Sequence, residues 1–429
     1  MSNRYEDTQM IGVEEARAVV LAQVAPLPAE QVGIVDAAGR VLAQDVVSDI
    51  DIAPFDSSAM DGFAVRYDDF TAAGDVSEQA PLTLEVIGLL GAGSVFEGTV
   101  GAGQALRIMT GAPLPAGIDT VVKIEDTQVR GEGEATPAGT QVVFTKTPAR
   151  GEHVRLHGEE AHAGDALLHI GDRVSSAAAG LLASTGTTTV AVYRRPRVAV
   201  FSTGNELVSP DEVPGPGQIR NSNSYALAAA IHEAGATATL LPRVEDTPEA
   251  LRATLETAVQ DHDVVVLSGG AAEGDFDYTT AVVRELGEML FNKVAMRPGK
   301  AQTFALIHGV PVFGLPGNPA ASVVGFEILV RPALLYMQGI TTLDRPITRA
   351  RVTQDVKKKE PRRFYLRARL ERAADGGFDV TPEKNQSSAL FSALNRSNCL
   401  LIVPYGLEPL TAGDEASCLR LDIDEGTVV

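Results

Sequence analysis

The chain has 429 residues, of which 45% are hydrophobic and 21% charged, and its formal net charge is −20. This length predicts two to four domains, and the acidic balance argues against a duplex nucleic-acid binder, which needs a basic face. We expect a cytoplasmic protein without signal peptide or membrane insertion, in which the two cysteines, Cys399 and Cys418, are core thiols rather than a disulfide framework or metal site.

The N-terminal part predicts a mixed domain interrupted by a β-rich insertion. Residues 13–24 have the pattern of an amphipathic helix, and residues 41–48 that of a strand. From about residue 54 to 147, short β-type runs alternate with Gly, Pro and Asp turns, at 82–90, 104–109, 120–125 and 141–146. A helical stretch follows at 175–186. We predict an N-terminal mixed α/β domain of residues 1–50 and 150–192, with an inserted β-rich domain at 51–149.

From Arg197 onwards strands and helices alternate. Strand patterns occupy 197–204, 236–244 and 263–270, and helix patterns occupy 221–235, 246–260, 279–287 and 319–339. Thr247 with Pro248, and Asn318 with Pro319, have the order of an N-cap and a first helical residue. The alternation predicts a doubly wound α/β domain at 193–340, with a parallel sheet covered on both faces. The β-type runs after Thr341 predict a small C-terminal β domain at 341–429.

Four polar turns follow strands of the predicted parallel sheet. They are STGNEL at 202–207, VED at 244–246, SGGAAEGDFD at 268–277 and LPGNP at 315–319. Parallel strands bring such turns to one edge, where α/β sheets bind ligands. The third turn combines glycines, which let backbone N–H groups approach an anion, with carboxylates, which repel one. A divalent cation between the carboxylates and a phosphate would reconcile the two.

Seven ordered stretches carry a family resemblance. They are PFDSSAMDGFAVR at 54–66, RIMTGAPLPAGIDTVVKIED at 107–126, VRLHGEE at 154–160, STGNELV at 202–208, GDFDYT at 274–279, AMRPGKA at 295–301 and GLPGNPAAS at 314–322. Together they resemble the MoeA/gephyrin E-domain family of molybdopterin molybdenumtransferases over nearly the whole chain.

The resemblance implies an elongated homodimer of four-domain subunits with a MogA-like doubly wound domain. It implies an active cleft between the doubly wound domain of one subunit and the β domain of the other. The implied reaction inserts molybdenum from molybdate into the dithiolene of adenylylated molybdopterin (molybdopterin-AMP), with Mg²⁺-assisted loss of AMP.

Five residues become catalytic candidates through their position and the matching motifs: Asp61, Thr110, Glu206, Asp246 and Asp277. The last three are also the candidate metal ligands, because Mg²⁺ prefers carboxylate oxygen. Other interpretations stay open for four of them. Asp61 and Thr110 could stabilise turns, Glu206 could be a solvated loop acid, and Asp246 could complement a helix dipole.

Substrate-binding candidates fall into four groups. The glycine turn contributes Ser268, Gly269, Gly270 and Gly274, and the turn before the last helix contributes Pro316, Gly317 and Asn318. Lys293, Arg297 and Lys300 could bind an oxyanion, and alternation along one strand would place the first two on one face, although a solvated basic edge is the alternative. Arg367 and Ser388 align with a family arginine and serine, although Arg367 could equally pack on a strand surface.

Three places depart from the usual family pattern. Ala272 and Glu273 stand in the glycine turn, Arg297 replaces a lysine, and Ser387 replaces a glycine. These departures keep a second hypothesis open, a gephyrin-like dimeric scaffold that binds a short peptide of a membrane or cytoskeletal partner. Its groove would involve Tyr336 and the C-terminal β domain.

Overall fold

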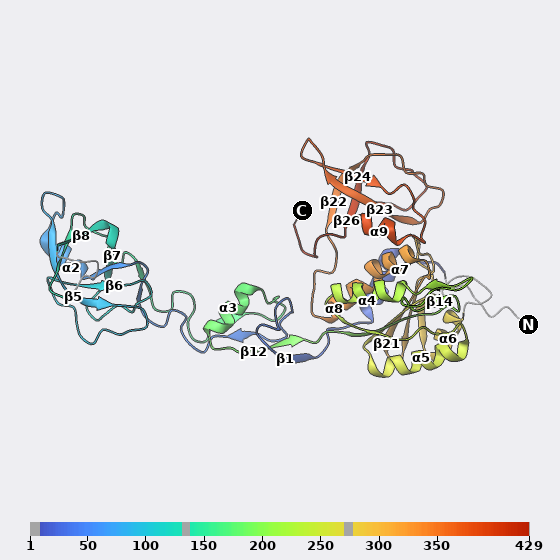
Figure 1. Cartoon of the computed structure of the whole chain (residues 1–429), viewed down its shortest axis with the longest axis horizontal. Helices are drawn as coiled ribbons and strands as arrows, with labels where there is room; N and C mark the ends of the chain where they lie inside the picture. The colour runs from blue at the N-terminus through green and yellow to red at the C-terminus, as the bar shows by residue number, and fades with distance from the viewer. Residues whose placement is uncertain (1–8, 131–137, 270–277, 429) are drawn as a thin grey trace, which may run out of the picture. The chain divides into compact units, whose positions relative to one another are not determined.

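The computed structural model describes residues 9–130, 138–269 and 278–428. The chain forms two compact units (Figure 1). The larger unit consists of Met1–Val32, Gly39–Ala43 and Ala191–Val429, and the smaller unit of Gly33–Ala38 and Gln44–Val190.

The smaller unit contains a six-stranded sheet with the order β7-β4-β6-β5-β9-β8. Each predicted β-run of the insertion contains one strand of this sheet, which confirms those four predictions. Its core includes Phe63, Phe70 and Phe144, whose rings meet edge to face. The elements are β2 (Val46–Val47), β3 (Ser57–Ser58), β4 (Gly62–Val65), α2 (Tyr67–Ala73), β5 (Leu82–Leu90), β6 (Gln104–Ile108), β7 (Thr120–Lys123), η1 (Ile124–Asp126), β8 (Thr127–Arg130), β9 (Gln141–Phe144), β10 (Val154–Arg155), β11 (Ala166–Leu168) and α3 (Ser176–Ser184).

The predicted strand at 41–48 is wrong as a single element. Leu42 pairs with Val192 in the larger unit, whereas Val46–Val47 pairs with β11 in the smaller unit. The chain therefore passes from one unit to the other within this run. At the same boundary lie β1 (Ala29–Gly33) and β12 (Thr189–Tyr193).

The larger unit contains the doubly wound layer, a six-stranded sheet ordered β16-β13-β17-β21-β20-β18. Alternate residues of β13 enter different cores, because Val198 and Val200 pack with α4 while Ala199 and Phe201 pack with α5. Figure 1 shows α4 and α7 on one face of the sheet and α5 and α6 on the other. The elements are α1 (Val13–Ala22), β13 (Arg197–Ser202), β14 (Leu207–Val208), β15 (Ile219–Arg220), α4 (Asn223–Glu233), β16 (Thr237–Leu240), α5 (Pro248–Asp261), β17 (Val264–Ser268), α6 (Thr279–Leu286), β18 (Glu288–Phe291), β20 (Thr303–Ile307) and β21 (Val310–Leu315).

The sheet is parallel only in part, which corrects the prediction. Strands β16, β13, β17 and β21 are parallel to one another, whereas β20 pairs antiparallel with both of its neighbours, β21 and β18. The cause is the two-residue turn of His308 and Gly309, with φ of 51° and 80°. Positive φ at both positions makes a tight hairpin, which joins antiparallel strands only.

The predicted helix at 319–339 is one helical run with a change of pitch. It consists of α7 (Pro319–Gly325), the π-helical turn η2 (Phe326–Val330) and α8 (Arg331–Met337). The π turn precedes Pro332, whose ring cannot continue a regular helix. Pro319 is at the first position as predicted, but Asn318 makes no side-chain cap hydrogen bond, so that detail is wrong.

This run bears on the expectation of a protein without membrane insertion. Among the described residues, Pro319–Met337 is long and apolar enough to cross a membrane, by length and composition alone. However, 83% of the stretch is buried inside the protein, as in the core helix of a domain.

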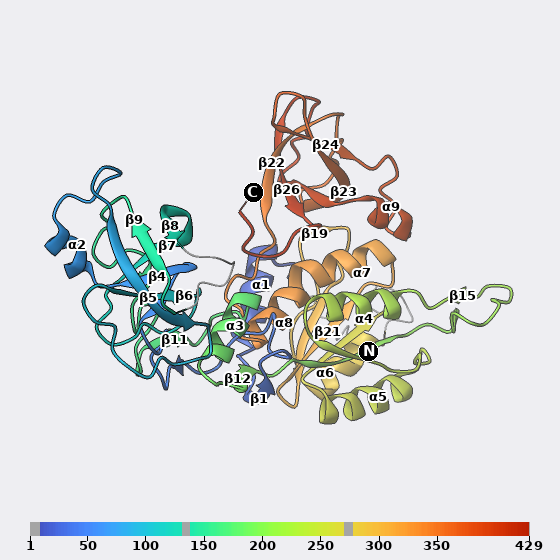
Figure 2. The ribbon, with the colours of Figure 1, turned by 60° about the vertical axis from the view of Figure 1, so that its left-hand side comes forward.

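The C-terminal part of the larger unit is a small β structure, as predicted (Figure 2). Its sheet has the order β19-β23-β24-β22-β26-β25 and closes through a β23–β25 pairing. Cys399 and Cys418 are buried in its core as free thiols, which confirms their expected place. The elements are β19 (Met296–Arg297), β22 (Ile347–Val352), β23 (Arg363–Arg372), β24 (Phe378–Pro382), α9 (Phe391–Arg396), β25 (Cys399–Val403) and β26 (Glu415–Arg420).

Candidate functional site

The described parts of the four polar turns meet at one edge of the doubly wound sheet. The backbone N–H of Thr203 donates to the carbonyl of Ser268, and that of Gly269 donates to the carbonyl of Leu315. Gly269 has a φ of 103°, and a Cβ there would lie 2.5 Å from the Thr203 carbonyl oxygen. Only glycine fits this close approach, so the glycine turn is fixed by its contact with the first turn.

Acidic side chains gather at the same edge. One carboxylate oxygen of Asp246 accepts from the backbone N–H of Asn205, and the Asn205 side-chain oxygen accepts from the N–H of Asp246, both at 3.3 Å. Asp246 is half-buried and Glu206 is exposed. The predicted Gly270, Gly274 and Asp277 lie outside the described residues.

The donor set at this edge is compatible with magnesium but is incomplete in the described part of the chain. Asp246 and Glu206 supply carboxylate oxygens, and the buried Thr203 hydroxyl beside Asp246 has no hydrogen-bond partner among the residues that the structure describes. Oxygen donors of this kind suit Mg²⁺. No group of three His, Cys, Asp or Glu residues positioned to hold a metal occurs in residues 9–130, 138–269 and 278–428.

Asn223 is a site residue that the sequence interpretation missed. Its side-chain amide donates to the Ser268 hydroxyl and to the Gly317 carbonyl, both at 2.8 Å. It thereby ties the end of β17 to the turn before α7, while its own side-chain oxygen is buried and has no partner within the described parts of the chain. The clue in the sequence was the polar run at 221–224, which opens the predicted helix at 221–235.

Asp61 and Thr110 form a pair in the smaller unit. One carboxylate oxygen of Asp61 accepts from the backbone N–H of Thr110 at 2.7 Å and from its hydroxyl at 2.8 Å. These two hydrogen bonds hold the pKa of Asp61 below its usual value. Both residues are exposed, so the pair is accessible while also stabilising its turn.

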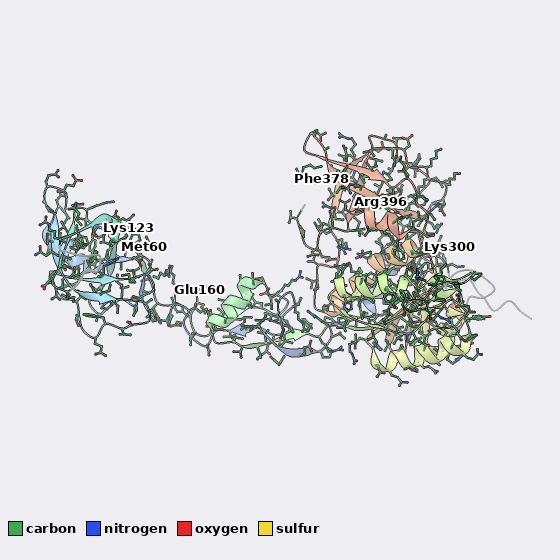
Figure 3. The ribbon with its side chains drawn as sticks, in the orientation of Figure 1. Met60, Lys123, Glu160, Lys300, Phe378 and Arg396 are labelled. Atoms are coloured by element: carbon green, nitrogen blue, oxygen red, sulfur yellow. The ribbon has the colours of Figure 1, made fainter. Side chains whose placement is uncertain are left out.

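A pocket of about 980 Å³ lies in the larger unit, where the doubly wound layer meets the C-terminal sheet. Lys300, labelled in Figure 3, is one of its lining residues. The lining includes the predicted Arg297, Lys300, Pro316, Asn318, Arg367 and Ser388. Residues from three of the four predicted substrate-binding groups therefore share one cavity.

Arg297 reaches this pocket because β19 joins the C-terminal sheet. Met296 and Arg297 pair in parallel with Arg363 and Phe364 of β23. The prediction that one strand carries both Lys293 and Arg297 is wrong, because β18 ends at Phe291 and β19 belongs to another sheet. Lys293 does not line the pocket.

Arg367 is the most buried cation of the pocket, with 1% of its surface exposed. Its guanidinium donates to the Ser387 carbonyl at 3.1 Å, and its Nε has no partner. It has no ion pair among residues 9–130, 138–269 and 278–428. Burial, together with the nearby charge of Arg297, lowers the pKa of Arg367 to about 10. The alternative that Arg367 packs on the surface is therefore wrong.

Ser388 contributes its backbone at the start of α7. Its carbonyl accepts from the backbone N–H of Ala320 at 2.8 Å, which satisfies one free donor of the first helical turn. Asn318 and Gly317 beside it are exposed. Tyr336, which the scaffold hypothesis placed in a groove, is half-buried on α8 and does not line the pocket.

Glu360 is a second residue that the sequence interpretation missed. Its carboxylate accepts from Arg297 Nη1 at 2.5 Å and from Arg362 Nε at 2.8 Å. Burial would raise the pKa of Glu360, but hydrogen bonds from Arg362 and Arg297 hold it below its usual value. The run KKKEPRR at 357–363 contained a signal, a single acid within a basic stretch next to a strand.

Three family models match consecutive parts of the chain. Residues 11–186 match the MoeA N-terminal region (domain I and II), residues 199–336 match a probable molybdopterin binding domain, and residues 349–421 match the MoeA C-terminal region (domain IV).

Curated relatives and solved structures are similar over almost the full length. A molybdopterin molybdenumtransferase of Staphylococcus epidermidis is 36% identical over 405 residues, 94% of each chain. One of Staphylococcus aureus is 35% identical over 420 residues, 98% of this chain and 97% of that one. A molybdopterin biosynthesis MoeA protein from Pyrococcus horikosii superposes with a TM-score of 0.81 at 35% identity, covering 96% of this chain and 99% of the other.

Proposed function

This chain belongs to the MoeA family of molybdopterin molybdenumtransferases and is a transferase of molybdenum cofactor biosynthesis, and we propose that it inserts molybdenum from molybdate into adenylylated molybdopterin with release of AMP. The observation that carries the proposal is the buried guanidinium of Arg367 in a large pocket, where no ion pair to it occurs among the described residues. A buried charge without a direct ion pair is costly even with the carboxylate of Glu383 nearby, and a bound oxyanion would compensate it.

The pocket would bind molybdate through its cations. Arg367 would supply the buried positive charge, and Lys300 and Arg297 line the same cavity. Molybdate is a tetrahedral dianion, and guanidinium groups bind such oxyanions with two parallel hydrogen bonds.

The strand-end edge would bind the phosphorylated pterin. Gly269 and Gly317 lie next to each other, because a Cβ built on Gly317 would be 3.5 Å from the Gly269 Cα. Neither glycine carries a side chain that would keep a ligand away from the backbone. Glu206 and Asp246, with Asp277, would hold Mg²⁺, which when bound would neutralise charge on the phosphoanhydride that is cleaved. Asn223 would keep the Ser268 and Pro316–Asn318 turns in register.

We also propose a cytoplasmic homodimer, as the family resemblance implies. Light scattering on the purified chain would test it, with a mass of about twice the 45.1 kDa of one chain expected. A monomer at micromolar concentration would contradict the dimer. A peptide-binding scaffold has no observation that favours it over the transferase.

The transferase proposal is tested with purified chain, adenylylated molybdopterin, molybdate and Mg²⁺. AMP release should depend on both molybdate and Mg²⁺ and should fall at least about 100-fold in Asp246→Asn, since losing one metal-ligand charge typically removes several kcal/mol of transition-state stabilisation. Glu249→Gln, which removes an acid in the first turn of α5, is the matched control and should retain activity. A well-folded parent chain that releases no AMP would overturn the proposal.

A further inference from the structure

Two of the arginines that line the pocket, Arg367 and Arg297, differ in how their charge is compensated. Arg367 is buried and has only a carbonyl partner in the part of the chain that the structure describes. Arg297 already holds a carboxylate, that of Glu360, at 2.5 Å. Of these two arginines, Arg367 has no carboxylate partner among the described residues, whereas Arg297 is paired with one from the protein itself.

Glu360 can release Arg297 and still be paired with a cation. Its second carboxylate oxygen accepts from Arg362 Nε at 2.8 Å, so the acid keeps one cationic partner if the other leaves. Its side chain is 28% exposed and that of Arg297 is 51% exposed, so both can rearrange within solvent.

Arg297 would stay in the pocket after such an exchange. Its guanidinium carbon lies 5.1 Å from the centre of the Phe364 ring, and its backbone is fixed by the pairing of β19 with β23. The planar fork of an arginine binds a carboxylate or an oxyanion through the same N–H groups. The two anions therefore compete for one group.

Resting on the oxyanion-binding role proposed above, we propose that Glu360 is an internal counter-anion of this pocket, which occupies Arg297 until an incoming oxyanion displaces it. Glu360 thereby lowers the affinity of the pocket for oxyanions, and this decrease in affinity is larger for ligands of higher charge. The reason is that a dianion is repelled by the retained carboxylate about twice as strongly as a monoanion of equal size.

The test compares two tetrahedral anions of similar shape, molybdate with two charges and perrhenate with one. Their dissociation constants are measured by calorimetry on the full chain and on Glu360→Gln. A dianion about 6 Å from a removed unit charge in a water-like medium should bind about tenfold more tightly, and the monoanion about threefold. Glu371→Gln is the control, because Glu371 is an acid at the exposed end of β23 that does not line the pocket.

The outcomes separate this inference from the proposed function. Tighter binding of both anions by Glu360→Gln, with the larger gain for molybdate, supports the counter-anion role, and so does binding by the variant alone. Unchanged or weaker binding by a folded variant overturns it. If the carboxylate only positioned Arg297 for the ligand, its removal would weaken binding. If neither protein binds either anion, the oxyanion role of the pocket and this inference both fail. Should Glu360→Gln not fold, Glu360→Asp decides, with a smaller gain in molybdate affinity expected and no gain contradicting the role.

Discussion

Arg367 is a residue whose proposed function would come at a cost in stability. Its guanidinium is almost fully buried, and burial lowers its pKa to about 10, the direction expected when the charged form is penalised. A charge held this way without an ion pair in the described part of the chain destabilises the free protein. Ligand binding would recover that free energy.

The variant Arg367→Met should therefore change binding and stability in opposite directions. Molybdate affinity should fall at least about tenfold, because one charge-assisted contact is typically worth 1.5–3 kcal/mol. The free energy of unfolding should be unchanged or about 1–3 kcal/mol higher, since replacing a buried charge by an apolar side chain removes its desolvation cost.

Calorimetry and urea unfolding measure the two effects. Arg369→Met is the control, because Arg369 lies two residues further along β23 but is exposed and paired with Glu371. Loss of stability together with retained molybdate binding in Arg367→Met would contradict this account.

At the residue scale the sequence predicted candidates better than it predicted their contacts. Arg297, Lys300 and Arg367 were found through matching motifs, and the structure places all three in one pocket. Glu360 was not found, because its contacts with Arg297 come from the pairing of β19 with β23, two segments that are far apart in the sequence. No local pattern contains that pairing.

Helix α5 positions Asp246, and its start depends on one side chain. The Thr247 hydroxyl accepts from the backbone N–H of Ala250 at 3.2 Å, as the sequence predicted. Thr247→Ala should lower the free energy of unfolding by about 1 kcal/mol, the typical value of an N-cap. Thr257→Ala, in the exposed middle of the same helix, should be neutral or slightly stabilising by chemical denaturation. Equal losses in both variants would contradict the capping role.

Strand β17 is anchored at its start by Asp263. Arg194 donates two hydrogen bonds to this carboxylate, at 2.7 and 2.8 Å, and the Arg197 N–H donates a third at 2.8 Å. Burial would raise the pKa of Asp263, but these hydrogen bonds hold it below its ordinary value of 3.8. A depressed pKa stabilises the fold above the unfolded-state pKa, and this stability is lost as pH falls through the folded-state pKa.

Asp263→Asn should therefore be destabilising by about 2 kcal/mol at pH 7, because one partner of a partly buried pair is removed. The difference from the parent should persist down to about pH 4 and shrink below it, as the parent's own carboxylate becomes protonated. Urea unfolding from pH 7 to pH 3 measures the trend. A difference that is constant across that range would contradict it.

At the element scale, the sequence predicted helices and strands that depend on nearby residues, but not features that depend on tertiary contacts or uncommon turns. Helix α5 was found from its periodicity, Thr247 and Pro248, and β5 from its apolar run. The antiparallel β20–β21 hairpin was missed because His308–Gly309 is not one of the common hairpin dipeptides. The π turn before Pro332 was missed because tertiary packing holds the helix together across it.

The two compact units contain separate hydrophobic cores. The smaller unit has the cluster around Phe63 and Phe144, and the larger unit has clusters on both faces of its doubly wound sheet. The pattern of apolar residues does not predict this division into two units. The chain enters and leaves the smaller unit within short segments near Gln44 and Val190.

Separate cores predict separate responses to mutation. Phe144→Ala should destabilise the smaller unit by about 3–5 kcal/mol, the usual cost of truncating a buried phenylalanine. In scanning calorimetry one part of the unfolding trace should shift to lower temperature while the rest stays in place, and Phe201→Ala should shift the complementary part. A single transition that moves as a whole in both variants would contradict independent cores.

The central claim is that this chain couples AMP release to molybdenum insertion. The direct measurement is a single turnover of enzyme-bound adenylylated molybdopterin with molybdate and Mg²⁺, in which AMP is quantified by chromatography and pterin-bound molybdenum by mass spectrometry. We predict one molybdenum inserted for each AMP released, with the yields of both reduced in Arg367→Met. AMP release without molybdenum in the pterin product, or equal yields from Arg367→Met and the parent, would contradict it.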